Sequence, residues 1–213
     1  MNIVSRTEWG AQEPQGPKIP LPTPDLFLHH DTANFTAVDE TSERKHMLLL
    51  ERTGKQRFGS TVSYSLVVFP SGRVYEGAGV GRKGTHTANH NSTGHGVVVV
   101  GNFETQTVPQ RTVDLLRQLH ADGITAGWWT GQWTPHRAVK ATACPGKNLF
   151  ARLADLNAPH TPPKEDDAMT PAQEAQLAEV RKRIDHANSE IRTVKQLIVD
   201  LTAKLDKSHP GSN

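Results

Sequence analysis

The run Val97-Val98-Val99-Val100 decides the fold class of this chain of 213 residues. Four β-branched residues without polar alternation predict a strand that is buried on both faces, as in the middle of a sheet. Other segments with the character of strands are 26–30, 62–69 and 73–76, and helical patterns cover residues 43–52 and 113–121. Strands and helices interleaved in this way predict an α/β domain with a mixed central β-sheet flanked by helices.

Composition excludes several classes of protein. The chain has 24 basic and 22 acidic residues and a net charge of only +2, so we expect no nucleic-acid partner. No apolar run approaches the roughly 18 residues that cross a bilayer, so we expect no membrane insertion. Residues 1–10 lack the basic start and apolar core of a signal peptide. We therefore expect a cytoplasmic protein unless another route releases it.

A change in composition near residue 158 predicts two parts. Residues 1–158 form the first domain, residues 159–169 a proline-rich and acidic linker, and residues 208–213 a disordered tail. Between them, residues 170–207 carry apolar side chains at alternating spacings of three and four: Leu177, Val180, Ile184, Ala187, Ile191, Val194, Ile198, Leu201 and Leu205. This heptad pattern predicts a C-terminal coiled-coil helix and a homo-oligomer. The alternative is a lone amphipathic helix that folds back on the first domain.

His136 and Cys144 are the first candidates for chemistry. Cys144 is the only cysteine, so it forms no intrachain disulfide, and a thiol eight residues after a histidine suggests a metal ligand or a nucleophile. Thiolate and imidazole together favour zinc, whereas the alternative is a buried thiol that acts as a small apolar side chain. A zinc enzyme needs a third protein ligand. His29 and His30 end the first apolar strand, and only one of them should face the site because strand neighbours alternate.

Several motifs, in a fixed order over residues 1–152, carry a family resemblance. They are Ser5-Arg6-Thr7-Glu8-Trp9-Gly10-Ala11, His30-Asp31-Thr32-Ala33, Ser63-Tyr64-Ser65-Leu66-Val67-Val68, Gly72-Arg73-Val74-Tyr75-Glu76-Gly77, Gly84-Thr85-His86-Thr87, Asn91-Ser92-Thr93, Gly101-Asn102-Phe103 and the segment from His136 to Gly146. Together they resemble peptidoglycan recognition proteins and phage-type N-acetylmuramoyl-L-alanine amidases.

The resemblance implies a zinc hydrolase that cuts the amide between N-acetylmuramic acid and L-alanine in peptidoglycan. It implies one Zn²⁺ per catalytic domain, with His30, His136 and Cys144 as ligands, because alignment on Thr32-Ala33 selects His30 over His29. It also implies a catalytic Tyr64 near the zinc-bound water.

Thr142 is the second catalytic residue that the resemblance implies. It matches a position that is lysine in some phage enzymes, and it can donate a hydrogen bond but no positive charge, so oxyanion stabilisation should depend more on zinc and Tyr64. One departure concerns the general base, because related enzymes carry a glutamate where this chain has Val97-Val98-Val99-Val100. Glu104 is the nearest carboxylate along the sequence, and the alternative base is the zinc-bound hydroxide itself.

His86 and Asn91 lie in a glycine-rich segment that we expect to line the substrate groove, although each is equally consistent with an ordinary surface position. The expected partner is peptidoglycan, both its glycan strand and its stem peptide. A compact catalytic domain with a short appendage favours a phage endolysin that lyses the host cell. The alternatives are a non-catalytic recognition protein and a bacterial cytoplasmic wall-recycling amidase. Loss of the cysteine ligand usually marks the non-catalytic members, and here Cys144 is present.

Overall fold

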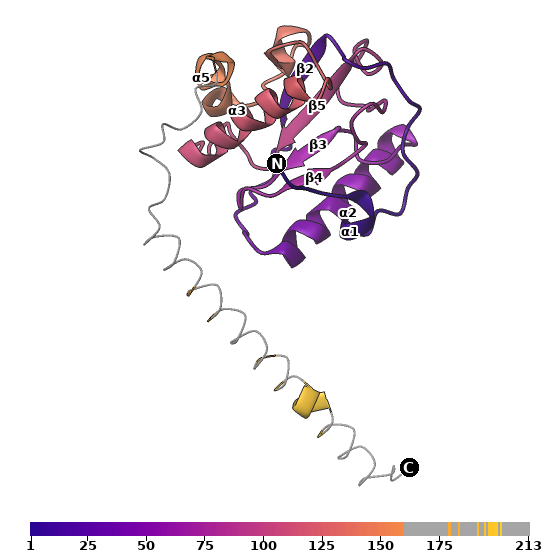
Figure 1. Cartoon of the computed structure of the whole chain (residues 1–213), viewed down its shortest axis with the longest axis vertical. Helices are drawn as coiled ribbons and strands as arrows, with labels where there is room; N and C mark the ends of the chain where they lie inside the picture. Colours follow the sequence, from indigo (N-terminus) through magenta and orange to yellow (C-terminus); the bar gives the residue numbers. More distant parts are fainter. Residues whose placement is uncertain are drawn as a thin grey trace. The chain divides into compact units, whose positions relative to one another are not determined.

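The computed structural model describes residues 1–159 and the scattered helical positions 179, 183, 191, 194, 196–199 and 201 (Figure 1). The chain divides into two compact units, residues 1–160 and 161–213. In the second unit, the described apolar residues Ile191, Val194, Leu197, Ile198, Val199 and Leu201 are helical and exposed. The predicted linker, coiled coil and tail otherwise fall outside the described residues and stay predictions. Among the described residues, no helix has the length and apolarity to span a membrane.

One mixed sheet organises the first unit. Its strands are β1 (Ile3–Val4), β2 (Asp25–His30), β3 (Leu66–Val68), β4 (Val74–Glu76), β5 (Gly94–Val99) and β6 (Trp133–Pro135). Their order across the sheet is β1-β4-β3-β5-β2-β6, and every neighbouring pair is parallel except the β3–β4 hairpin. Val97, Val98 and Val99 of the valine run lie in β5, between β3 and β2, so the expected central strand and the mixed sheet are confirmed.

Helices cover both faces of this sheet (Figure 1). They are α1 (Arg6–Trp9), α2 (Glu40–Phe58), α3 (Gln110–Thr125), the 3₁₀ turn η1 (His136–Ala138), α4 (Lys147–Phe150) and α5 (Leu153–Asn157). Leu116 and Leu119 of α3 pack with Leu26 and Leu28 of β2 in one apolar cluster. Met47 of α2 belongs to a second cluster on the opposite face. We call these the α3 face and the α2 face.

Helix α2 is longer and strand β3 is shorter than the sequence predicts. Helix α2 extends beyond residues 43–52 because Asp39 accepts a hydrogen bond from the Ser42 amide (2.8 Å) at its start, and Gly59 ends it with φ 61°. The strand predicted at residues 62–69 is shorter. The carbonyl of Tyr64 accepts a hydrogen bond from the Ala78 amide (2.7 Å), so Tyr64 bonds to the loop after β4.

Candidate metal centre

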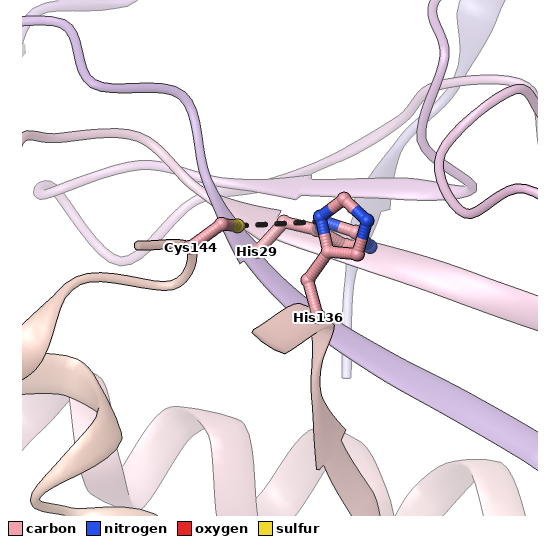
Figure 2. Close-up of side chains that lie close together, drawn as sticks. All are labelled: His29, His136 and Cys144. Carbon is pink, nitrogen blue, oxygen red and sulfur yellow. Dashed lines mark hydrogen bonds between the residues drawn. The ribbon is translucent and has the colours of Figure 1, made fainter. Parts of the chain in front are cut away.

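His29, His136 and Cys144 come together at one edge of the sheet (Figure 2). Each offers one donor atom, and the three donor atoms all lie within 4.8 Å of one another. The Sγ atom of Cys144 is 3.6 Å from Nδ1 of His29, and the rings of His29 and His136 are 4.6 Å apart between centroids. Side chains from distant parts of the sequence thus meet in a single cluster.

Strand register explains why the two histidines meet. Strands β2 and β6 are parallel neighbours, and Leu28 pairs with Pro135. The residues that follow this pair are His29 and His136, at the carboxyl ends of the two strands. This arrangement places two imidazoles at one edge of the sheet, where loops leave room for a ligand.

Cys144 reaches the cluster on a loop that Arg137 holds in place. The backbone amide of Arg137 donates to the Cys144 carbonyl (3.0 Å), and its guanidinium donates to the carbonyls of Ala143 and Cys144. The same guanidinium lies over the ring of Phe150, 4.6 Å from its centroid. Arg137 thus ties the cysteine loop to the turn that carries His136. Arg137 was not among the predicted site residues, although its place beside a candidate ligand was a signal for it.

The selection of His30 as the third ligand is corrected by this geometry. His30 points to the α3 face, with Leu26 and Leu28, because alternate residues of a strand share a face. There its Nδ1 accepts a hydrogen bond from the backbone amide of Phe103 (3.3 Å). His29 occupies the opposite face, and it is the histidine that lies with His136 and Cys144.

Burial sets the charge state of the cluster. Desolvation, followed by the neighbouring histidines, lowers the pKa of His29 well below its usual value, and desolvation also lowers the pKa of His136. Both imidazoles are therefore neutral near pH 7, which is the form that binds a metal. Burial raises the pKa of the Cys144 thiol to about 11, so the thiol keeps its proton until a cation replaces it.

The donor set fits zinc. Two imidazole nitrogens and one thiolate sulfur are ligands that Zn²⁺ prefers, and three protein ligands leave a fourth position for water or substrate. Harder ions such as Mg²⁺ and Ca²⁺ are less well matched, because carboxylate oxygen is absent from the group formed by His29, His136 and Cys144. The three residues can thus hold a catalytic type of zinc site.

Tyr64, which the family resemblance implies as a catalytic residue, lies beside this cluster. Its ring centroid is 5.2 Å from that of His29. Burial, and next the nearby Cys144, raises the pKa of the phenol above its ordinary value, so the hydroxyl stays protonated and can donate a hydrogen bond. Tyr64 also lines a cavity of about 230 Å³ with Arg57 of α2 and His86. Tyr64 and His86 border this cavity on one side and contact the His29 ring on the other, so the cavity offers space for a ligand near the cluster.

The other predicted site residues have identifiable contacts. The exposed Thr142 accepts a hydrogen bond from the Cys144 amide through its hydroxyl (3.2 Å), so it shapes the cysteine loop. His86 is buried and lines the cavity, and desolvation lowers its pKa to about 3. Asn91 accepts from the Thr87 amide (2.9 Å) and so holds the loop before β5. Glu104 accepts from the Lys147 amide (2.9 Å) at the start of α4, which gives it a structural role.

Sequence and structure comparisons agree on one family. The family model described as N-acetylmuramoyl-L-alanine amidase matches residues 20–147. Peptidoglycan-recognition protein SD of Drosophila simulans is 30% identical over 71% of this chain and 83% of its own length. Human N-acetylmuramoyl-L-alanine amidase is 34% identical over 71% of this chain, but this region covers only 27% of the human protein.

Solved structures give the same result. The structure of wild-type Drosophila PGRP-LB matches with a TM-score of 0.69 and 27% identity, over 77% of this chain and 98% of that one. A second structure, a tyrosine-to-phenylalanine mutant of Drosophila PGRP-LB in complex with tracheal cytotoxin, matches with a TM-score of 0.68 and 26% identity, over 75% of this chain and 96% of that one. The chain belongs to the N-acetylmuramoyl-L-alanine amidase family, which includes peptidoglycan-recognition proteins among its relatives.

Proposed function

We propose that this protein is a zinc-dependent N-acetylmuramoyl-L-alanine amidase that cleaves the amide between N-acetylmuramic acid and L-alanine in peptidoglycan. The observation that carries the proposal is the convergence of His29, His136 and Cys144 beside Tyr64, which itself lines a cavity large enough for part of a ligand. The family membership and the relatives named as amidases support the same reaction.

In this proposal, His29, His136 and Cys144 hold one zinc ion. When bound, zinc supplies a Lewis acid that polarises the scissile carbonyl and makes a water molecule more acidic. Tyr64 keeps its proton and donates a hydrogen bond to the carbonyl oxygen, where negative charge develops as the amide carbon is attacked. Thr142 adds no charge to this oxygen, and through Cys144 it positions the loop that bears the thiol.

Peptidoglycan is the proposed substrate, both its glycan strand and its stem peptide. The PGRP-LB mutant bound to tracheal cytotoxin supports this assignment, because that protein is similar to this chain over most of its length. The cavity between α2 and the loop that bears His86 offers both charged and apolar side chains, including Arg57 and Leu50. Such a lining suits a peptide that carries carboxylates and short aliphatic side chains.

Non-catalytic recognition is the second candidate, because several relatives are named as recognition proteins. This function requires binding without cleavage. The presence of Cys144 together with both histidines favours catalysis, since a recognition surface has no need of a half-buried thiol between two neutral imidazoles.

A phage endolysin is the proposed biological setting, with the protein in the host cytoplasm until it reaches the cell wall. A wall-recycling amidase is the alternative. The two differ in substrate size, because an endolysin attacks the intact wall and a recycling enzyme acts on soluble fragments. Zinc-loaded protein is therefore given purified sacculi and soluble muropeptides in parallel. Release of material from the sacculi at a rate comparable to fragment cleavage supports an endolysin, and cleavage of fragments alone supports recycling.

Identification of the new chain ends tests the reaction itself. Digestion of purified cell wall by the zinc-loaded protein is expected to expose free L-alanine amino groups without new reducing sugars. New reducing ends would mean a glycosidase, and binding to the wall without any new ends would mean a recognition protein. Removal of zinc with a chelator should stop the release of L-alanine ends, and added zinc should restore it.

Self-association through residues 170–207 is a separate proposal, supported by the heptad pattern of the sequence. Sedimentation of the full chain and of a chain ending before residue 160 tests it. We expect the full chain to sediment as an oligomer and the shorter chain as a monomer with unchanged cleavage of soluble fragments. A monomeric full chain would refute the oligomer.

A further inference from the structure

We propose that Thr87 and His86 fix the tautomer of His29, so that Nδ1 of His29 is presented to the metal. This inference rests on the proposed zinc site, and it assigns positioning roles to two residues of the loop before β5. A neutral imidazole carries its proton on only one of its two nitrogens. A histidine that binds zinc through Nδ1 must therefore carry its proton on Nε2.

A line of hydrogen-bond partners runs from the backbone of β5 to the metal cluster. Nε2 of His86 is 3.4 Å from the carbonyl oxygen of Gly94, and its Nδ1 is 3.0 Å from the hydroxyl of Thr87. The same hydroxyl is 3.3 Å from Nε2 of His29, whose Nδ1 lies 3.6 Å from the sulfur of Cys144. His86, Thr87 and His29 are all buried, so water competes little for these contacts.

Chemistry sets the direction of each contact. A carbonyl oxygen only accepts, so Nε2 of His86 carries the proton and donates to Gly94. Since the buried His86 ring is neutral, its Nδ1 is an acceptor, and the Thr87 hydroxyl donates to it. The hydroxyl has one hydrogen and therefore offers only a lone pair to His29. Nε2 of His29 donates to that lone pair, which leaves the lone pair on Nδ1 directed at the cluster (Figure 2).

Glycine at two positions makes room for the His86 ring. A β-carbon at Gly96 of β5 would overlap Cγ of His86, and a β-carbon at Gly84 would come within 2.8 Å of its Cδ2. The ring is thus seated directly on the strand backbone, which limits its rotation. Gly94 and Thr87 each contact one nitrogen of this ring. The donor and the acceptor in every contact from Gly94 to His29 are therefore fixed as well.

A second buried threonine–histidine pair provides a matched control. The Gly81 amide donates to Nε2 of His95 (2.9 Å), so Nδ1 of His95 carries the proton and donates to the Thr23 hydroxyl (2.8 Å). His95 therefore has the opposite tautomer to His29, and it is outside the group of three metal donors. Thr23→Val removes a buried hydroxyl from a histidine in the same sheet, as Thr87→Val does, but leaves the metal cluster alone.

The test combines nitrogen NMR of the histidine rings with zinc affinity. In the zinc-free full chain, we expect the ¹⁵N shifts of His29 to show a proton on Nε2 and those of His95 a proton on Nδ1. Thr87→Val should mix the two tautomers of His29 and weaken zinc binding by about 10- to 100-fold, as loss of a partner to a metal-binding histidine does. Thr87→Ser should restore both, and Thr23→Val should change neither.

Two results would overturn the inference. One is a His29 ring in the zinc-free protein that carries its proton on Nδ1, which is read from the unmodified chain and needs no variant to fold. The other is a folded Thr87→Val protein whose zinc affinity stays within about twofold of the original, well below the effect expected for such a partner. Failure of the proposed function looks different. The chain would then bind zinc through Nδ1 of His29 and yet release no L-alanine ends from peptidoglycan.

Discussion

The two faces of the sheet bury histidine in different ways. On the α3 face, His95 uses both ring nitrogens, one as donor to Thr23 and one as acceptor from the Gly81 amide, and it packs against Trp129. On the α2 face, His29 uses one nitrogen for Thr87 and turns the other toward Cys144. Both rings are almost fully buried, so exposure does not distinguish them.

The difference shows what separates a core histidine from a metal ligand. A ring whose two nitrogens are satisfied by neighbours has no lone pair to offer, and its burial is stabilised by those bonds. A ring that directs one lone pair at a weak donor such as a thiol gains less from that contact, and a bound cation makes better use of the lone pair. Without a metal, Nδ1 of His29 faces only the thiol of Cys144 (3.6 Å), a weak donor, at the carboxyl ends of β2 and β6 beside His136, and we assign function to that place.

The largest expected effect comes from removing the thiol. Cys144→Ser should lose zinc and reduce amide cleavage by about 10³-fold or more, because several kcal/mol of charge stabilisation disappear and each 1.4 kcal/mol is about a factor of ten. Zinc content and release of L-alanine ends measure the two effects together. A Cys144→Ser protein that cleaves at the original rate without metal would refute the mechanism. Its folding is checked by its thermal unfolding, which does not depend on catalysis.

A pair of variants on adjacent residues compares the two faces directly. His29→Ala should weaken zinc binding by more than about 100-fold, a larger loss than that of a residue that only supports a ligand. His30→Ala should keep zinc and lose about 1–3 kcal/mol of stability, because the Phe103 amide loses its acceptor. Zinc titration and thermal unfolding of both proteins separate the roles. The reverse result, with zinc lost only from His30→Ala, would restore the ligand chosen from the sequence.

The sequence predicted the sheet more completely than the ligand set. The valine run identified the central strand, and the spacing of His136 and Cys144 identified two donors. The sequence also shows which residues of β2 share a face, since Leu26 and Leu28 mark one apolar face and His29 lies on the other. The alternation of side chains alone does not say which of the two faces carries the site. That depends on β6 lying beside β2, a pairing of segments far apart in the sequence.

Other contacts of the site depend on the same long-range packing. Thr87 meets His29 because the loop before β5 folds over the end of β2, and no spacing rule in the sequence predicts that approach. Arg137 holds the cysteine loop through backbone carbonyls. Every residue has such a carbonyl, so the side chains of the loop do not predict this contact. Tyr64 was found only through the resemblance, because a tyrosine at a strand start is more often a core residue.

Tyr64→Phe tests catalysis on the α2 face, and its expected effect is smaller than that of removing a metal ligand. Loss of the phenol hydroxyl should lower kcat by about 10²-fold, as loss of one donor to a developing oxyanion does. Zinc content and substrate KM should remain near their original values, since Tyr64 is outside the group of three donors. The measurement is steady-state cleavage of a soluble muropeptide, with zinc content determined on the same samples. A kcat that stays near the original value would remove Tyr64 from the mechanism.

The α3 face is expected to give a pH dependence of stability that does not involve the metal cluster. Desolvation lowers the pKa of His95 to about 4, whereas the unfolded chain binds this proton near pH 6.5. Above pH 6.5 both states are neutral at this ring and His95 adds no pH dependence. As the pH falls from 6.5 to 4, the unfolded state takes up the proton first, so the free energy of unfolding decreases by up to about 3 kcal/mol.

His95→Gln isolates this contribution. Urea unfolding of the original chain and of His95→Gln at several pH values from about 7.5 down to about 4, each without zinc, gives two curves of stability against pH. Glutamine has no proton to gain in this range, so the variant should lose less stability than the original between about pH 6.5 and 4. The remaining slope of the variant belongs to the other buried histidines, such as His86, whose pKa is also lowered. Parallel curves would mean that His95 takes up its proton at the same pH in the folded and the unfolded chain, and its Thr23 and Gly81 contacts would then need a different assignment of protons.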